Sequence, residues 1–137
     1  MILDDIAAYL ITKGVAVAPP PNNADLPDGA WPVYEGYFPD DVVQTMGVFE
    51  TIGQPALTMN RDAVGLSFQM RVRGLRLNYA ATHAQWQACF DALQDSQPTP
   101  AYALVQAAYY GPMTFNDDRG RPNFITNFKV VYVPGAA

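Results

Sequence analysis

A chain of 137 residues, half of them hydrophobic, has the length of one domain and enough apolar side chains for a real core. Its net charge of -5 argues against non-specific binding of nucleic acid over the whole surface, and its single cysteine excludes an internal disulfide. Only 15% of the residues are charged, against roughly 25% in ordinary soluble domains, which favours an oligomer that hides surface against partners.

The N-terminus does not have the pattern of a signal peptide. Asp4 and Asp5 stand where such a peptide would carry positive charge. No run of the sequence approaches the roughly 20 apolar residues that span a bilayer. We therefore expect a soluble protein that is made in the cytoplasm and has no membrane partner.

The first predicted element is a helix over residues 2–13, because apolar side chains recur there at helical spacing. Asp4 and Asp5 favour its first turn through the helix dipole, and Gly14 is a natural stop. The proline-rich stretch 15–32 that follows cannot form a helix and lacks donors for a sheet. We expect it to be an extended connection or an exposed arm.

Three strands are predicted next. Residues 33–38 are rich in aromatic and β-branched types and end at the turn signal Pro-Asp-Asp, 39–41. Residues 42–51 are apolar on both faces, which favours a central place in a sheet. A loop over 53–64 separates this strand from the third one, 65–73.

The strand 65–73 alternates strictly between apolar and polar side chains. The apolar set is Leu66, Phe68, Met70 and Val72, and the polar set is Ser67, Gln69, Arg71 and Arg73. This alternation is typical of a half-buried strand, with one face on a core and the other face polar.

A second helix is predicted over residues 77–94, with Asn78 as its N-cap. An apolar stripe runs down it at steps of four and three residues, formed by Tyr79, His83, Trp86, Phe90 and Leu93. Two more strands, 101–111 and 123–134, follow, and the connection 111–122 between them is too long for a tight hairpin turn.

The order of these elements predicts an α+β fold, because the strands come in runs and do not alternate strictly with helices. We expect residues 1–137 to form a single domain. Its core would lie between a mostly antiparallel sheet of about five strands and two helices packed on one face.

The sequence carries no catalytic, cofactor or metal motif, so we do not expect an enzyme. His83 is read as a packed or edge histidine, and Cys89 lies roughly 600° of helix rotation away, which argues against a Cys–His nucleophile pair. The acidic pairs at 40–41 and 117–118 lack the spacing of a calcium loop and suit turns. The glycines are scattered and form no phosphate loop.

Two groups of residues remain as candidates for an interface. Arg71, Arg73 and Arg76 form either a solvated face paired with carboxylates such as Glu50, or a patch for a partner. The segment 111–122 places apolar side chains among polar ones, and they either fold back or reach a neighbour. Its candidate interface residues are Met113, Phe115, Asp117, Asp118 and Arg119, and with Arg121 the charged members suit reciprocal ion pairs.

Four segments together resemble the tail-terminator family of tailed phages, neck-ring proteins that are also described as minor capsid proteins. These segments are DDIAAYLITKGVAV (4–17), YEGYFPDDVVQTMGVFETIGQPAL (34–57), VGLSFQMRVRG (64–74) and YAATHAQWQACFDALQ (79–94). The resemblance rests on their order over residues 4–94, since no single motif is diagnostic. The dense prolines at 19–21 and the segment 111–122 depart from the family pattern.

The resemblance implies a structural role in the virion, at the junction of head and tail, after assembly in the host cytoplasm. Six copies would form a ring that caps the tail tube and docks to the connector, with genomic DNA passing through the lumen without sequence-specific binding. The implied partners are other copies of the chain, the tail tube protein and a head-completion protein. The implied fold is likewise a mostly antiparallel sheet with two helices.

Two other functions compete with this one. A head-completion protein that binds the portal ring would share the small size, the α+β content and the oligomeric state. A small-ligand binding domain would need a concave pocket with convergent polar groups. Within the ring hypothesis, Arg71 and Arg73 are expected to meet an acidic patch of the next copy, such as Asp117 and Asp118, in preference to the lumen.

Overall fold

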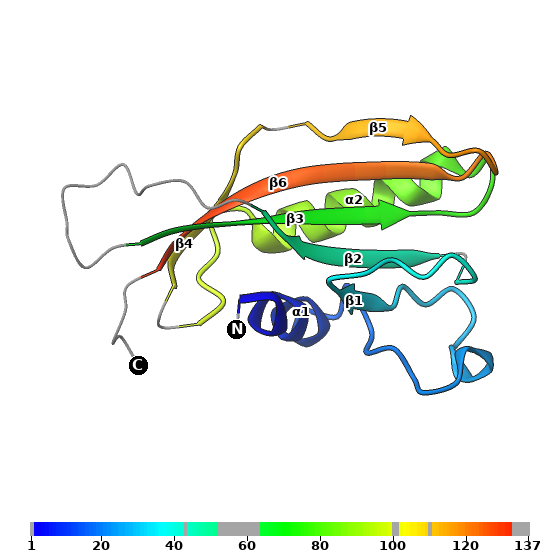
Figure 1. The fold of residues 1–137 in the computed structure, drawn as a ribbon, viewed down its shortest axis with the longest axis horizontal. Helices are drawn as coiled ribbons and strands as arrows, with labels where there is room; N and C mark the ends of the chain where they lie inside the picture. Colours follow the sequence, from blue (N-terminus) through cyan, green and yellow to red (C-terminus); the bar gives the residue numbers. More distant parts are fainter. Residues whose placement is uncertain (1, 43, 52–63, 100–101, 110, 133–137) are drawn as a thin grey trace.

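One mostly antiparallel sheet organises the chain in the computed structural model, which describes residues 2–42, 44–51, 64–99, 102–109 and 111–132 (Figure 1). Its helices and strands are α1 (Ile2–Thr12), the short 3-10 helix η1 (Asn23–Asp25), β1 (Val33–Glu35), β2 (Thr45–Glu50), β3 (Val64–Arg73), α2 (Tyr79–Leu93), β4 (Tyr102–Ala107), β5 (Met113–Asn116) and β6 (Pro122–Tyr132). The predicted α+β class, with both helices on one face of the sheet, is confirmed.

The strands follow the order β1-β2-β3-β6-β4 across the sheet, and β5 also pairs with β6. β1 and β2 are the parallel pair, whereas the other pairs are antiparallel. β3 pairs with β6 along its full length, so β4 and β5 share the other edge of β6, at its two ends. The sheet therefore begins at β1 and ends at β4 and β5, on opposite edges (Figure 1).

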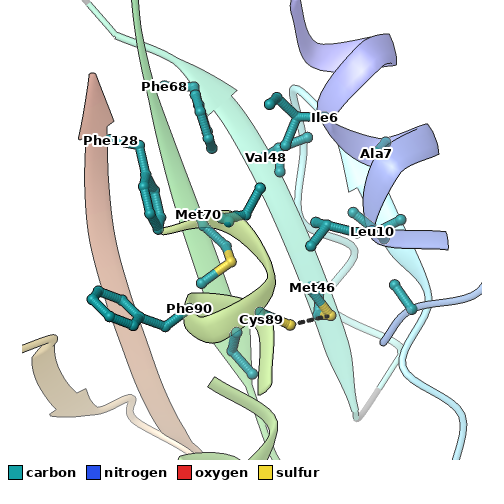
Figure 2. Close-up of a cluster of buried hydrophobic side chains, with 14 of the residues drawn as sticks. Ile6, Ala7, Leu10, Met46, Val48, Phe68, Met70, Cys89, Phe90 and Phe128 are labelled. Carbon is teal, nitrogen blue, oxygen red and sulfur yellow. Dashed lines mark hydrogen bonds between the residues drawn. The ribbon is translucent and has the colours of Figure 1, made fainter. Parts of the chain in front are cut away.

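The core lies between the sheet and the two helices (Figure 2). Phe68, Met70 and Val72 of β3 point into it, as the alternation predicts, and have no exposed surface. Phe68 stacks on Phe128 of β6 with ring centroids 5.1 Å apart. Thr126 is a polar side chain on this face, and its hydroxyl accepts a hydrogen bond of 2.7 Å from the Trp86 indole N–H. Both polar groups therefore have a partner inside the core.

The second helix agrees with the sequence except at its first turn. Asn78 is its N-cap and accepts a hydrogen bond from the Ala81 backbone N–H, as predicted. Trp86, Phe90 and Leu93 of the apolar stripe are buried. The stripe does not hold for Tyr79 and His83, which are exposed. Both rings contact Phe124 from outside the core, and His83 also contacts Trp86.

The proline-rich stretch is a closed loop and not an arm, because its two ends are tied together. Val17 forms a bridge with Pro32 and donates a backbone hydrogen bond of 3.0 Å to Trp31. Val33 donates in turn to Val17, which covers the outer edge of β1. Residues 18–31 thus form an excursion that contains η1 and returns to the sheet.

The segment 111–122 was predicted to be a loop too long for a tight turn, and this prediction is wrong. Residues 113–116 form the strand β5, and a short turn over 117–121 joins it to β6. The strand predicted at 33–38 ends earlier, at Glu35. Of the loop predicted at 53–64, Val64 belongs to β3 and the remaining residues lie outside the described ones.

The stacked pair Phe68–Phe128 makes a testable contribution to stability. Replacing Phe128 by alanine removes a fully buried ring and leaves a cavity, so we expect the free energy of unfolding to fall by about 3–5 kcal/mol. Urea unfolding followed by circular dichroism measures the change. Tyr109→Ala, at a side chain that is 77% exposed, is the control and should change stability by less than about 0.5 kcal/mol; equal losses in both variants would contradict this core.

Candidate functional site

The end of the sheet near β5 gathers most of the predicted interface residues. It is built on the turn between β5 and β6, where the Asp117 carboxylate accepts hydrogen bonds from the backbone N–H groups of Arg119 and Arg121, at 3.0 and 2.9 Å. Gly120 adopts a φ of 73° in this turn, which side chains with a Cβ rarely allow. A Cβ there would also lie 3.2 Å from the Arg76 side chain. The turn therefore needs both Asp117 and Gly120.

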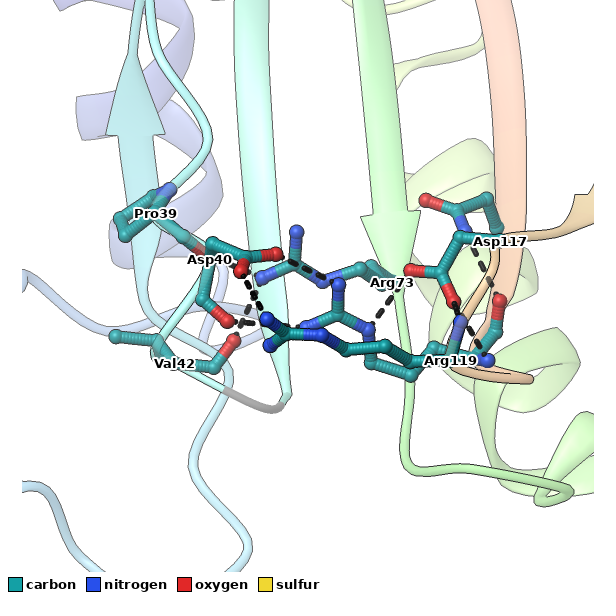
Figure 3. Close-up of polar contacts among 8 residues, drawn as sticks. Pro39, Asp40, Val42, Arg73, Asp117 and Arg119 are labelled. Atoms are coloured by element: carbon teal, nitrogen blue, oxygen red, sulfur yellow. Dashed lines mark hydrogen bonds and ion pairs between the residues drawn. The ribbon is translucent and has the colours of Figure 1, made fainter.

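Arg121 is the centre of a clamp that joins this turn to the loop 36–42. Figure 3 shows Asp40 of the loop facing Asp117 and Arg119 of the turn. Its guanidinium contacts Asp117 at 2.7 Å and Asp40 at 2.8 Å, and it also donates to the Asp40 backbone carbonyl. Arg119 adds a second contact to Asp40, at 2.9 Å. Since the Arg121 side chain is only 8% exposed, these contacts hold the two segments together and leave little of Arg121 for a partner.

The clamp also lowers the pKa values of its two carboxylates. Hydrogen bonding to Arg121 lowers the pKa of Asp40, with further help from the nearby guanidinium charges. For Asp117, burial acts to raise the pKa, but the hydrogen bonds from Arg121 and Arg119 outweigh it and the pKa is lowered. Both groups are therefore charged at neutral pH.

Arg73 is not part of an exposed basic patch, contrary to the sequence-based expectation. It is 4% exposed, and its guanidinium donates to the backbone carbonyls of Pro39 and Val42. The same group lies over the Phe38 ring, 4.3 Å from its centroid. Arg73 thus binds the loop 36–42 of its own chain to the sheet. A contact between Arg73 and Asp117 or Asp118 of the next copy would require this loop to move away, so the expected pairing does not fit the structure.

Arg71 lies on the same polar face, further from the clamp. It donates to the Gln69 amide at 2.6 Å and stacks over Phe49 at 5.0 Å. The carboxylate partner expected from Glu50 is absent, because Glu50 pairs with Phe68 in the strand register, away from Arg71. Gly47 makes room for the rings above it, since a Cβ there would lie 2.7 Å from Phe49. Arg71 is half-buried, and its interface role stays a prediction.

The remaining predicted residues are exposed around β5. Met113 is 61% exposed and Phe115 is 48% exposed. Arg76, Asp118 and Arg119 are exposed beside them. Three further apolar side chains, which the sequence did not indicate, are exposed near this turn. They belong to the segment that leads into α2: Leu75, Leu77 and Tyr79. Leu77 donates its backbone N–H to Gly120, which places this segment against the turn.

The sequence contained a signal for part of this site. Asn-Asp-Asp-Arg-Gly at 116–120 combines residue types that favour tight turns, and a strand-forming triplet precedes it. The role of Arg121, by contrast, depends on Asp40, which is 81 residues away in the chain. No local pattern predicts such a contact.

A shallow hollow of about 490 Å³ lies elsewhere on the polar face, beside β4. Its lining is mostly amide, hydroxyl and amine groups, from Thr51, Ser67, Gln69, Tyr109, Asn127 and Lys129. Gln69 and Asn127 already bond to each other at 3.0 Å. Two of its principal amides are thus engaged with each other, so the hollow does not offer the convergent free groups that a small ligand needs.

No chemical centre joins these features in the described part of the chain. There, no group of three or more His, Cys, Asp and Glu side chains is placed to hold a metal ion. The described helices include none that is long and apolar enough to span a membrane. His83 is an edge histidine on the surface, and the Cys89 thiol is fully buried, 3.8 Å from the Met46 sulfur (Figure 2).

Comparisons with known proteins give no family. No family model matches the chain, and no curated protein matches it. A solved structure from Akkermansia muciniphila is similar over 68% of this chain, with 10% identity and a TM-score of 0.41. The match covers 43% of that protein, so the chain spans less than half of its length. A likeness this distant carries no argument about function.

The burial of Cys89 predicts an unreactive thiol. Burial raises its pKa to about 12, so at a pH of about 8 almost no thiolate forms. We expect a thiol reagent to label the native protein at least a thousandfold more slowly than the urea-unfolded chain. Ala84→Cys, on the exposed side of the same helix, should react at once. Rapid labelling of native Cys89 would contradict the packing around it.

The clamp predicts a defined pH dependence. Removing a hydrogen-bonded charge costs about 1.5–3 kcal/mol, so Arg121→Met should lower the free energy of unfolding at neutral pH by that order. Because the pKa values of Asp40 and Asp117 are lowered on folding, their contribution is complete above about pH 4 and is lost as the pH falls through the lowered values.

Urea unfolding of wild type and Arg121→Met between neutral and strongly acidic pH tests this. The difference in stability between the two proteins should shrink in acid. Arg76→Met, at an exposed arginine beside the same turn, is the matched control and should change stability by less than about 0.5 kcal/mol. A difference that stays constant with pH would show that Arg121 acts through packing alone.

Proposed function

We propose that this chain is a structural protein of a tailed-phage neck, which assembles into a ring, caps the tail tube and joins it to the head connector. The observation that carries the proposal is the exposed strand β5, whose four residues are all accessible and include Met113 and Phe115. Exposed apolar side chains on a free strand edge are a liability unless a partner covers them. A ring subunit has such a partner on each side.

The composition and the fold support the same function. A low charged fraction of 15% suits a subunit that buries several surfaces. The sheet with two helices on one face has the architecture that the resemblance to tail terminators implies. The described residues gather their conspicuous side chains at a sheet edge and not around a reaction centre, which favours assembly over catalysis.

The partners follow from this role. Other copies of the chain would cover the sheet edges, the tail tube protein would bind one side of the ring, and a head-completion protein the other. DNA would pass through the lumen without sequence-specific contacts. Strong attraction between arginines and phosphates would slow this passage, so we expect weak contacts there.

Light scattering on a sizing column tests the assembly directly. We expect the purified chain of 15.0 kDa to form a discrete ring of about six copies, alone or when mixed with the tail tube protein of the same genome. A monomer that does not bind the tail tube protein but binds the portal complex would instead indicate that the chain is a head-completion protein. A monomer that binds neither the tail tube protein nor the portal complex would contradict the neck function.

A further inference from the structure

The charge of the chain is divided unevenly between the two edges of the sheet. Residues 1–42, which build α1, the proline-rich loop, β1 and the loop 36–42, carry seven acidic side chains and one lysine. Residues 64–137, which include β3, β4, β5 and β6, carry six basic side chains and four acidic ones. The β1 side of the molecule is therefore strongly negative, and the β5 side has a small excess of positive charge.

The exposed surface beside β1 concentrates this negative charge. We call it the acidic edge and define it by Asp25, Asp28, Glu35, Tyr37 and Asp41, all of which are exposed. Asn23 donates to the Asp41 carboxylate at 3.2 Å, which ties the proline-rich loop to the loop 36–42. The pKa of Glu35 is raised by a hydrogen bond with Asp4, by partial burial and by repulsion from the Asp4 charge, as expected where carboxylates lie close together.

The acidic edge also offers an apolar contact. Tyr37 is 58% exposed, and its ring meets that of Tyr34 edge-on at 5.2 Å, so a buried aromatic residue supports it from behind. An aromatic ring held in this way among carboxylates suits a partner that is both apolar and cationic.

The surface around β5 has those two properties. We call it the β5 edge and define it by Met113, Phe115, Arg76 and Arg119. Its two apolar side chains stand on alternate residues of β5 and so share one face of the strand. Asp118 is the exposed carboxylate on the adjoining turn, and Arg119 is already paired with Asp40 of its own chain at 2.9 Å, so Arg76 is the arginine of this edge outside that pair.

β5 is also the sheet edge that the described part of the chain leaves uncovered. The outer edge of β4 is occupied by backbone bonds between Val105 and both Asp95 and Ser96, at 2.8 and 2.9 Å. That of β1 is covered by Val17. β5 pairs with β6 alone among the described strands. Its unpaired N–H groups are donors that carboxylates accept well.

We propose that the β5 edge of one subunit docks on the acidic edge of the next, so that copies meet head to tail. The inference rests on the ring function proposed above. The two surfaces differ in charge, and the strands beside which they lie, β1 and β5, are on opposite edges of one sheet (Figure 1). Two different surfaces are what a heterologous interface requires. A symmetric dimer through two β5 edges would instead bring the arginines of both copies together and leave the acidic edge unused.

A pair of substitutions at Phe115 tests the charge of the surface that β5 meets. Phe115→Glu and Phe115→Lys remove the same ring from an exposed position, where either should fold. Against an acidic partner, we expect the glutamate variant to assemble at least about tenfold more weakly than the lysine variant. Ala84→Glu, exposed on α2, controls for net charge and should assemble as wild type. Equal assembly of the two Phe115 variants would overturn the proposal.

Mixing two defective variants tests the head-to-tail arrangement. Phe115→Glu damages only the β5 edge, and the double variant Asp25→Lys with Asp28→Lys damages only the acidic edge. Each should remain monomeric alone in analytical ultracentrifugation. Their mixture should associate, beginning with one-to-one pairs, because each contributes the surface that the other has lost.

The outcomes separate this proposal from the ring function. If the Asp25 and Asp28 double variant assembles like wild type, the acidic edge is not the partner surface, although the ring function stands. If wild type forms rings and both Phe115 variants do as well, the β5 edge is not the interface. If wild type stays monomeric even with the tail tube protein, both proposals fail together.

Discussion

The buried guanidinium of Arg121 is the contact on which the β5 end of the molecule depends. It joins the start of β6 and the neighbouring turn at Asp117 to the loop around Asp40, which is 81 residues away in the chain. A charge that is almost fully buried is stable only when carboxylates and carbonyls satisfy it. The turn and the loop must therefore keep their positions, and β5 is held on the edge of β6 as a consequence.

Arg73 extends the same constraint to the polar face of the sheet. By bonding to Pro39 and Val42 and stacking on Phe38, it fixes the loop 36–42 over that end of the face. Of the three arginines predicted to form a patch, Arg73 is buried and stabilises the fold, whereas Arg71 and Arg76 remain accessible at the surface. The fixed loop leaves the β5 edge as the accessible part, with its apolar side chains directed outward. A partner would therefore meet the strand edge and not the arginine face.

The sequence predicts the parts of the fold that depend on local patterns. The alternation in β3 and the spacing in α1 each report burial of one face, and that burial is what the structure has. The strand β5 could not be predicted with the same ease, because its alternation of apolar and polar side chains covers only four residues and its apolar side chains are exposed. The burial of Arg73 depends on Phe38 and Pro39, which lie 35 and 34 residues earlier in the chain, and charged side chains are almost never fully buried without such partners. Of the site, the sequence therefore identifies the exposed residues of the segment 111–122 and misses the contacts that position them.

Tail tubes assembled in the presence of the protein give the most direct test of the central claim, that the chain caps a tail tube as a ring. Electron microscopy of tubes grown with and without it measures both the length of the tubes and the density at their ends. The account predicts that growth stops when the protein is added and that a single ring appears at one end of each tube. Tubes that elongate unchanged, with no added density at either end, would contradict it.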